Sequence, residues 1–528
     1  MARKHNIGGF VDGKIVKQFT KFIYPFKYHK PDTTCRIFEE IQSSKGNPIR
    51  IWDCFGIDGQ DLHEEIANLY SFHETRERIA DCFQLGIHNK CREAIGLPPK
   101  ATDNITFTMR GRKDTVNISI PNVRVYLFES EVGFIEVECE YQTQNIEDYI
   151  DCNYFISEIK SEKNTFTMQR RISATEKFVS TFTMEDLIKN VLYYVGDDIR
   201  FFDNVGKEFN EKKPIIYSYL LLDKKPTNLE QIIYYARKNY KASYKPPASD
   251  FIIEGNPQVY QTFDNSYWGT SQYGTTNISF LVGDRQTDEF FHNNFVYKLN
   301  NSYFHLFLSV LHQKYATRLL TTKMSHLDKV VKDYEIMQQQ ACQAREYQAQ
   351  SASLKFRAFF NVPSNIEHVN RYYDLVTHTF EIEKIYQSFN EDLNSIISLS
   401  DTYTAKSNEY QREKKELERK KIGVYVLLFG TIISAVTMLS SVWTVIEKIA
   451  GEPVRVGSPL MIIIFSALLL LITVAAANVF IRIHEIKEAS YQLEEQKRTG
   501  ELGKDCIRKK RRKYIRIKDK EHLQKESE

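Results

Sequence analysis

Two stretches near the C-terminus contain no charged residue: IGVYVLLFGTIISAVTMLSSVWTVI at residues 422–446 and VGSPLMIIIFSALLLLITVAAANVFI at residues 456–481. A helix rises about 1.5 Å per residue and the hydrocarbon core of a bilayer is about 30 Å thick, so each stretch is long enough to cross it. Buried helices of soluble proteins rarely need about 18 uncharged residues in succession. We therefore predict transmembrane helices at residues 422–446 and 459–481, joined by an external loop at 447–458.

The flanking charges predict the orientation of this hairpin. Six basic residues precede the first stretch, whereas the loop holds only Lys448 and Arg455. Residues 482–528 form a basic tail with a dense run of Lys and Arg at 508–520. Because cytoplasmic flanks carry the excess of Lys and Arg, we expect both termini in the cytoplasm and the tail against anionic lipid. The N-terminus lacks the apolar run of a secretory signal, and the eight cysteines form no regular framework, which agrees with a reducing compartment.

The composition of the whole chain narrows its class. Its 528 residues are 42% hydrophobic and 26% charged, which excludes a globally disordered protein. With 71 Lys and Arg against 68 Asp and Glu, the net charge of +3 is too balanced for a nucleic-acid coat, and we expect no DNA partner. The mean hydropathy of −0.43 hides the two spans because it averages them with a polar remainder.

The sequence pattern of the N-terminal part predicts a mixture of helices and strands. Residues 1–245 are predicted to form a cytoplasmic α/β domain, and residues 246–300 its β-rich continuation. The predicted elements are a helical segment at 63–97, a strand meander at 116–120, 123–128 and 134–141, a buried strand at 214–222 and a helix at 228–240. A boundary is expected at the Pro-rich segment 244–249.

Residues 301–421 are predicted to form a helical stalk. Ser364 and Glu367 have the spacing of a capping box. After them, apolar residues recur at alternating spacings of three and four, with one slip between Phe380 and Ile385, and no Gly or Pro occurs from 366 to 421. The prediction is one continuous helix from residue 366 to 446. The fold class is therefore an α+β cytoplasmic domain, a long coiled-coil stalk and a two-helix transmembrane hairpin.

Small and hydroxylated side chains follow a stripe along the first span: Gly430, Ser434, Thr437, Ser441 and Thr444. One interpretation is close helix packing through small residues. The other is that the stripe lines an aqueous pore in a symmetric oligomer, where hydroxyls replace part of an ion's hydration shell. The register of the stalk favours the pore.

This layout resembles the CorA family of divalent-cation channels over roughly residues 300–520. The resemblance implies a homo-oligomer, a pentamer as in that family, with the first span lining the pore. Magnesium transporters of the family carry Gly-Met-Asn at the outer end of that span, where this chain reads SSVWTVI at 440–446. The departure argues against ordinary Mg²⁺ selectivity and makes the chain similar to the divergent CorA-like proteins encoded with type III CRISPR systems. Those are taken to be inner-membrane effectors of bacterial antiviral defence that respond to a conjugate of S-adenosylmethionine with AMP and then compromise the membrane.

A small nucleotide ligand needs an aromatic partner and fixed donors. In the segment 260–285, Tyr267, Trp268 or Tyr273 can stack on adenine, and Arg285 can bind a phosphate or carboxylate with two N–H groups. The basic loop at 110–113 is a second candidate. The alternatives are an aromatic hairpin packed on the core and an ordinary basic turn.

No motif in the sequence requires catalysis. Residues 8–14 have the spacing of a phosphate-binding loop, but Ile15 follows where Ser or Thr is needed. No zinc-like or nucleophile-elbow spacing occurs, so we expect neither an enzyme nor a protein-bound metal. The leading hypothesis is a membrane pore gated by a nucleotide messenger. The alternatives are a constitutive transporter of Mg²⁺ or other divalent cations, and a non-conducting membrane-anchored scaffold.

Overall fold

The computed structural model divides the chain into two compact units, Met1–Ile397 and Ser398–Glu528, which are described separately. The structure describes these residues: 13–29, 51–57, 61–70, 82–112, 115–159, 161–171, 177–196, 199–202, 213–327, 334–450, 462–463, 465–467, 469–470 and 472–492. The helices and strands below lie within these ranges.

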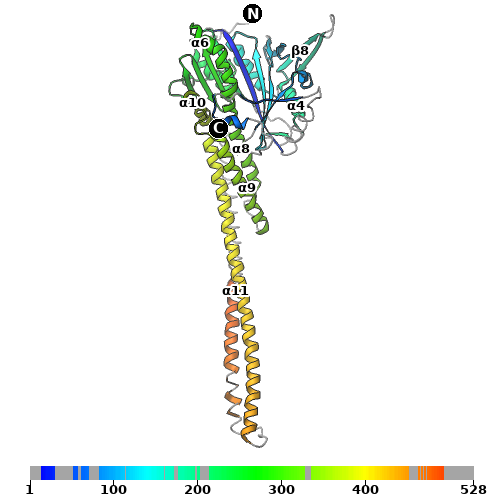
Figure 1. Ribbon diagram of the computed structural model, residues 1–528, viewed down its shortest axis with the longest axis vertical. Helices are drawn as coiled ribbons and strands as arrows, with labels where there is room; N and C mark the ends of the chain where they lie inside the picture. Colours follow the sequence, from blue (N-terminus) through cyan, green and yellow to red (C-terminus); the bar gives the residue numbers. More distant parts are fainter. Residues whose placement is uncertain are drawn as a thin grey trace. The chain divides into compact units, whose positions relative to one another are not determined.

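A large sheet organises the first unit (Figure 1). Its central strand, β1 (Ile15–Tyr28), lies between β7 (Val132–Tyr141) and β11 (Ile215–Leu222). β11 pairs in parallel with β14 (Gly274–Phe280), and the other pairs are antiparallel. The remaining described strands are β2 (Trp52–Cys54), β3 (Cys82–Ile87), β4 (Ile105–Thr108), β5 (Thr115–Ser119), β6 (Val123–Phe128), β8 (Thr165–Arg171), β9 (Lys177–Phe182), β10 (Ile199–Phe201), β12 (Val259–Phe263) and β13 (Ser266–Ser271).

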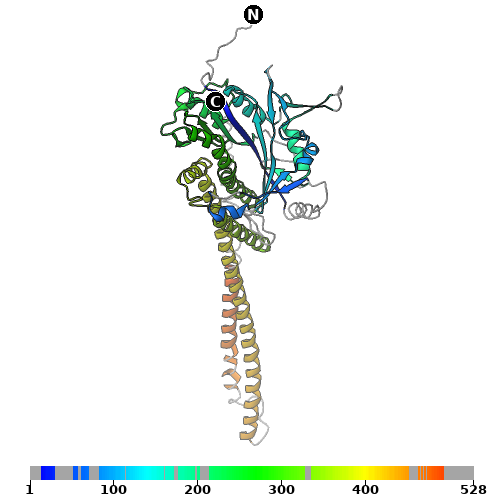
Figure 2. The ribbon, with the colours of Figure 1, turned by 45° about the horizontal axis from the view of Figure 1, so that its top comes forward.

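Helices cover both faces of this sheet, because its strands are apolar on both sides. On β11, Ile216 and Leu220 belong to one core, and Tyr217 and Tyr219 belong to the other. The first core includes residues of α3 (Ile146–Ser157), α4 (Met184–Tyr193) and α5 (Leu229–Lys238). The second is covered by α8 (Phe304–Ser325) and α10 (Glu367–Thr379) (Figure 2). A strand buried on both faces reads as a continuous apolar run, as IIYSYLLL does.

The predicted strands at 116–120, 123–128, 134–141 and 214–222 and the predicted helix at 228–240 are confirmed. The meander is not: β5 and β6 both pair with β7, so they form the two halves of one interrupted strand. Pro121 lies at the interruption and has no N–H to donate to the ladder.

The predicted helical segment at 63–97 is confirmed only in part, because a strand lies within it. The chain forms α2 (Glu64–Leu69), then β3, then a 3₁₀ helix, η1 (Asn89–Ile95). Long-range pairing of β3 with β6 outweighs the helical pattern of the local sequence.

Two π-helical turns lead into α8. After the 3₁₀ helix η2 (Ala248–Phe251) and α6 (Arg285–Glu289), the chain forms η3 (Phe290–Asn294), α7 (Phe295–Lys298) and η4 (Leu299–Tyr303). A π turn displaces the usual helical hydrogen bonds. Hydroxyls from β11 bond to these turns: Tyr219 donates to Phe291 O at 3.0 Å and Tyr217 donates to Leu299 O at 2.8 Å.

The expected stalk begins later than predicted. Nearly all of α8 is buried in the second core, so it belongs to the first unit, as does α9 (Tyr334–Ala358). Between α10 and α11 (Ile382–Ala450), Glu381 adopts a left-handed φ of 53°, which breaks the helix predicted to run without interruption from residue 366. The predicted capping box is also absent, because Ser364 donates to Asp61 O and the helix begins after Ile366.

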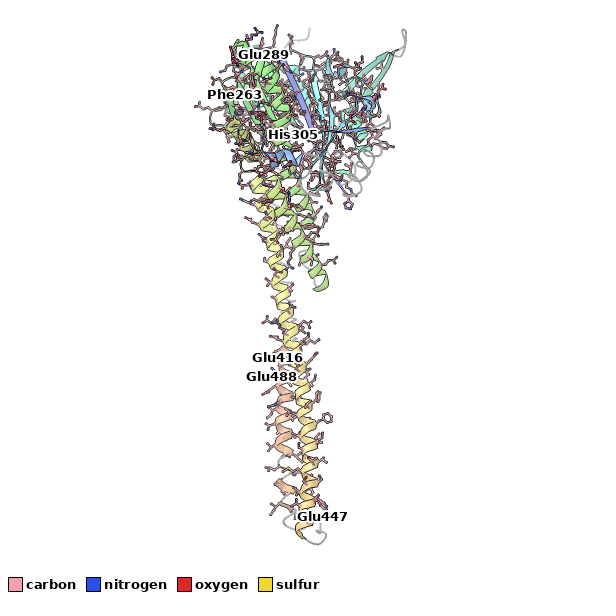
Figure 3. The ribbon with its side chains drawn as sticks, in the orientation of Figure 1. Phe263, Glu289, His305, Glu416, Glu447 and Glu488 are labelled. Atoms are coloured by element: carbon pink, nitrogen blue, oxygen red, sulfur yellow. The ribbon has the colours of Figure 1, made fainter. Side chains whose placement is uncertain are left out.

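The second unit contains the rest of α11 and a second helix within Phe465–Gln492 that runs alongside it (Figures 1 and 2). Figure 3 marks Glu416 on the first of these helices and Glu488 on the second. Both helices are long and apolar enough to cross a membrane, at Asn408–Val445 and Phe465–Gln492. Only 6% of the apolar window of the first helix is buried within the chain.

Candidate functional site

The first of the two helices that are long and apolar enough to cross a membrane has one covered side. The less exposed positions of this stretch recur with heptad-like spacing at Tyr410, Leu417, Val424, Leu428, Ala435, Leu439 and Val442. We assign this side to contact with the second helix, which runs alongside (Figure 1). The predicted pore-lining stripe points elsewhere, since at about 100° per residue its centre lies roughly 145° around the helix from this side.

Large apolar residues occupy a third side of the same helix. Tyr425, Phe429, Ile432 and Val436 are exposed and lie between the other two sides. This side is suited to lipid contact. Gly430, Ser434, Thr437, Ser441 and Thr444 are also exposed, so the second helix does not cover the small-residue side.

Backbone carbonyls of α11 satisfy most hydroxyls in this stretch. Thr437 Oγ1 donates to Ile433 O at 2.9 Å, Ser441 Oγ to Thr437 O at 2.8 Å and Thr444 Oγ1 to Ser440 O at 2.7 Å. A hydroxyl that donates to its own helix retains acceptor capacity on its outer side. At the end of the stretch, the indole of Trp443 donates to Glu447 at 2.8 Å, and Figure 3 marks Glu447.

The four residues predicted to bind a nucleotide do not converge. Tyr267 and Trp268 are neighbours on β13 and lie in the two different cores, on opposite faces of the sheet. Trp268 is fully buried, with its ring centroid 4.1 Å from that of Tyr372. Tyr273 is 42% exposed at the β13–β14 turn, and Arg285 begins α6. Trp268 therefore packs as part of the core, which was the alternative to ligand stacking.

The β13–β14 turn instead contacts the α10–α11 joint. The amide of Gln272 donates to Thr379 O at the end of α10 and accepts from Lys314 Nζ at 2.9 Å. Lys314 also lies over the ring of Phe380, 4.5 Å from its centroid. Burial and the nearby Arg318 lower the pKa of Lys314 to about 8. The aromatic segment found in the sequence thus contacts the joint through Gln272.

A cavity of about 900 Å³ opens at this joint. Its walls come from both sides of the break: Thr377 and His378 of α10, and Ile382 and Lys384 of α11. The remaining walls are the end of α9 with the segment after it, and Gln313 of α8. Ligand pockets typically measure about 300–1,000 Å³, so a drug-sized molecule fits.

Gln313 is the fully buried polar residue of the cavity wall. Its amide nitrogen donates to Ala358 O at 2.5 Å and to Tyr373 Oη at 2.9 Å. A carbonyl can only accept, so Ala358 fixes which end of the carboxamide is nitrogen. The carboxamide oxygen is then left with no hydrogen-bond partner.

Aromatic and charged side chains complete the cavity. Phe356, Phe359 and Phe360 line it, and Phe356 is 83% exposed. The charged residues of the wall are Lys355, Lys384, Asp374, Glu381 and Glu383. Lys384 pairs with Glu381 at 3.2 Å, and Lys355 lies 5.0 Å from the centroid of the Tyr386 ring.

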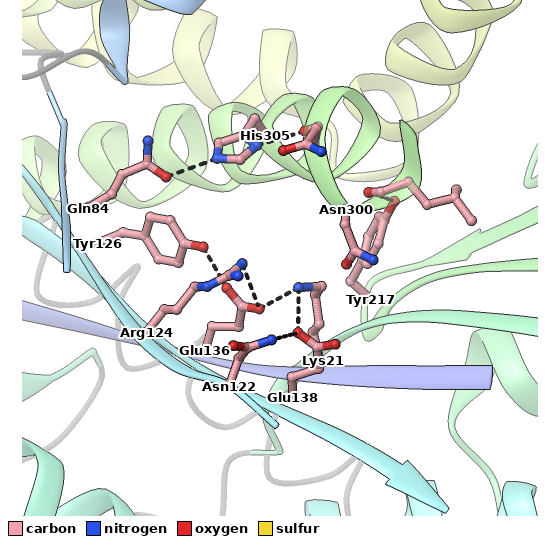
Figure 4. Close-up of polar contacts among 12 residues, drawn as sticks. Lys21, Gln84, Asn122, Arg124, Tyr126, Glu136, Glu138, Tyr217, Asn300 and His305 are labelled. Carbon is pink, nitrogen blue, oxygen red and sulfur yellow. Dashed lines mark hydrogen bonds and ion pairs between the residues drawn. The ribbon is translucent and has the colours of Figure 1, made fainter. Parts of the chain in front are cut away.

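A buried ionic cluster lies between the sheet and α8 (Figure 4). Lys21 Nζ contacts Glu136 and lies 3.1 Å from Glu138, while Tyr126 donates to Glu136. Lys21 is also 4.5 Å from the ring centroid of Phe304 on α8. Burial alone raises the pKa of Glu136, but Lys21 and Arg124 outweigh it and hold the pKa below its usual value.

Two histidines of α8 also contact the sheet side. His305 bonds to Gln84 at 2.9 Å, and His312 stacks on Phe128 with ring centroids 3.9 Å apart. Burial lowers the pKa of His312 to about 3. The cluster and these histidines are contacts between strands and one helix, so they fix the position of α8.

Other sequence candidates are only partly described. In the basic loop, Arg112 pairs with Asp148 at 2.9 Å and Asp151 at 2.5 Å, which fits the ordinary turn, and Lys113 lies outside the described residues. The segment 8–12, the loop beyond residue 450 and the basic tail after residue 492 also lie outside them, whereas residues 482–492 continue the second helix. Within the described residues, no group of three or more His, Cys, Asp or Glu side chains is placed to hold a metal ion.

Sequence reasoning missed the joint cavity. Its walls combine four separate helices, and the one signal in the sequence was the slip in apolar spacing between Phe380 and Ile385. Comparison with known proteins does not assign a family: no protein-family model and no curated protein matches the chain.

Proposed function

We propose that the chain is one subunit of a ligand-gated membrane channel. The observation that carries this proposal is the continuity of α11, which is one helix from Ile382 at the joint cavity to Ala450 beyond the first span. A change in backbone angle at residue 381 can therefore be transmitted along an uninterrupted helix to the first span. A helix of 69 residues needs neighbours for stability, which the hairpin partner and further copies of the chain would supply.

The uncovered small-residue side of the first span supports a pore between several copies. Among the described residues of the hairpin, no helix covers Gly430, Ser434 and Thr437, so both interpretations of the stripe call for a second chain. Five copies, as the CorA resemblance implies, would gather these sides around one axis. The hydroxyls of Ser434, Thr437, Ser441 and Thr444 would then face water, and the large apolar side would face lipid.

The resemblance supplies the ligand of this proposal: a nucleotide messenger formed from S-adenosylmethionine and AMP. The protein would act as a multi-pass effector of type III CRISPR defence in the bacterial inner membrane, with both termini cytoplasmic and its basic tail on anionic lipid. The ligand can open the pore only through its preference for the open state, and a shift from 1% to 99% open needs about 5.5 kcal/mol of such preference. Several ligand sites in one oligomer can together supply this free energy.

The test is efflux from proteoliposomes that contain the full chain and an entrapped fluorescent dye or Mg²⁺ indicator. We expect efflux when the S-adenosylmethionine–AMP conjugate is added, and none with S-adenosylmethionine or AMP alone. Mg²⁺ flux that needs no nucleotide would favour the constitutive transporter. A protein that never conducts, with or without the conjugate, would favour the scaffold.

A further inference from the structure

We infer that the cavity at the α10–α11 joint binds a small planar heteroaromatic molecule that carries charged groups of both signs. The inference rests on the proposed function only in taking α11 as the responding element. The cavity itself lies wholly within the first unit.

The aromatic side chains of the cavity wall favour a flat ligand. Phe359 and Phe360 are half-buried in the wall, whereas Phe356 on the last turns of α9 is 83% exposed. The neighbouring positions Leu354 and Ala358 are fully buried, so α9 turns its apolar side inward and still leaves Phe356 outside. A ring that stacks on Phe356 removes this exposed surface from water, and aromatic stacking serves any heterocyclic base.

The charges of the wall exclude a simple polyanion. Two lysines, Lys355 and Lys384, face three carboxylates, Asp374, Glu381 and Glu383. A ligand with phosphate groups alone would meet more negative than positive charge. A dipolar ligand, with an amine or other cationic group as well as an anionic group, can pair with both sets.

Occupancy of this cavity would be coupled to the angle of the joint. Thr377 and His378 precede the break, and Ile382 and Lys384 follow it, so a change of bend at Glu381 moves one set of walls relative to the other. A ligand that contacts both sets binds the two geometries with different affinities, which is the condition for shifting their populations. Lys384 contributes directly, since its partner Glu381 is the residue at the bend.

The test compares two variants of the full chain in detergent. Phe356→Ala removes the stacking ring, and Tyr193→Ala removes an aromatic side chain that is 73% exposed on α4, outside the cavity. Binding of the S-adenosylmethionine–AMP conjugate, S-adenosylmethionine and ATP is measured by isothermal titration calorimetry. At least one probe should bind the wild type, and Phe356→Ala should raise its Kd at least tenfold while Tyr193→Ala leaves it within twofold.

A third variant and a measurement of oligomeric mass complete the test. Thr377→Trp fills the cavity and should abolish binding with no loss of the folded signal in circular dichroism. Equal affinity in the wild type and all three variants would place the ligand elsewhere and overturn the inference, while leaving the channel proposal to the efflux assay. A lower oligomeric mass for Phe356→Ala would assign this ring to a subunit contact, and failure of all three probes to bind the wild type would also overturn the inference.

Discussion

Lys21 is a fully buried ammonium group whose two carboxylate partners are also buried. Removing one partner of a buried charge cluster leaves the others unpaired, which costs about 3–5 kcal/mol. We predict that Lys21→Met lowers the free energy of unfolding by about this amount, measured by urea denaturation in detergent. The matched control is Lys189→Met, whose pair with Glu185 is exposed, and it should change stability by less than about 0.5 kcal/mol. Equal effects of the two variants would contradict the role assigned to the cluster.

His312 makes the stability of the protein sensitive to acid. Its folded pKa of about 3 lies below the ordinary value of about 6.5, so from pH 6.5 downward the unfolded chain binds a proton here that the folded chain does not. Stability therefore falls as the pH falls, and this residue accounts for about 2 kcal/mol between pH 7 and pH 5.

We predict that His312→Gln removes this part of the pH dependence, although the variant is less stable at pH 7 because it loses the stacking on Phe128. The measurement is the free energy of unfolding at pH 7 and pH 5. His378→Gln is the control, since His378 is exposed, and it should keep the wild-type slope. An unchanged slope in His312→Gln would count against a neutral, buried imidazole.

Single residues also show why the predicted ligand site was wrong in part. The aromatic density of residues 260–285 is real, but alternation along a strand sends Tyr267 and Trp268 to opposite faces, which the pattern already implied. What the sequence could not reveal is that Tyr303 and Tyr372, from distant segments, cover Trp268. Residues that meet only through tertiary packing leave no local signal.

At the scale of elements, the joint depends on the backbone of one residue. Glu381 has a φ of 53°, a conformation that costs a non-glycine residue about 1–2 kcal/mol. We predict that Glu381→Gly raises the free energy of unfolding by about 1 kcal/mol and that the β-branched Glu381→Ile lowers it by at least as much.

The control for this pair is Glu383→Gly. Glu383 lies in the first turn of α11, where a glycine should cost about 1 kcal/mol. Stabilisation by glycine at 381 and destabilisation at 383 would confirm the bend in the detergent-solubilised protein. Destabilisation at both positions would instead favour the continuous helix that the sequence alone predicted.

Helices and strands with strong local patterns could be predicted from the sequence, and their arrangement could not. The strand β11 was predicted because burial on both faces leaves a nearly continuous apolar run. The helix α5 was predicted because burial on one face leaves a helical periodicity. The break at Glu381 was missed because no Gly or Pro marks it. Burial of Phe380 against Phe307 fixes the end of α10 there, and that contact joins residues 73 positions apart (380 − 307).

The same limit applies to the stalk. Its apolar stripe was interpreted as coiled-coil-like, but Phe389 and Leu393 of that stripe are buried within the chain's own first unit. Ser351 of α9 donates to Tyr386 at 3.2 Å, so α9 occupies this side of α11. A heptad-like pattern indicates that a helix is covered and does not identify what covers it.

In the molecule as a whole, we propose that α11 connects the cavity at the α10–α11 joint to a membrane-spanning helix. The two units are linked by this one helix, since the boundary between Ile397 and Ser398 falls inside Ile382–Ala450. Hinges in ligand-controlled proteins are a few residues that absorb a large change in backbone angle, and Glu381 is placed to serve as one. The account requires that the small-residue side of the first span, and no other side, borders the conducting path.

The most direct measurement of this claim compares two neighbouring serines. Ser441 lies on the small-residue side, and Ser440 lies about 100° around the helix on another side. Each is replaced by Cys in proteoliposomes, in a background whose native cysteines are changed to Ser or Ala, and a charged, water-soluble thiol reagent is added while conjugate-triggered efflux is recorded. The account predicts that the reagent blocks efflux through Ser441→Cys and leaves Ser440→Cys unaffected. Block at Ser440→Cys alone, or equal effects at both positions, would contradict it.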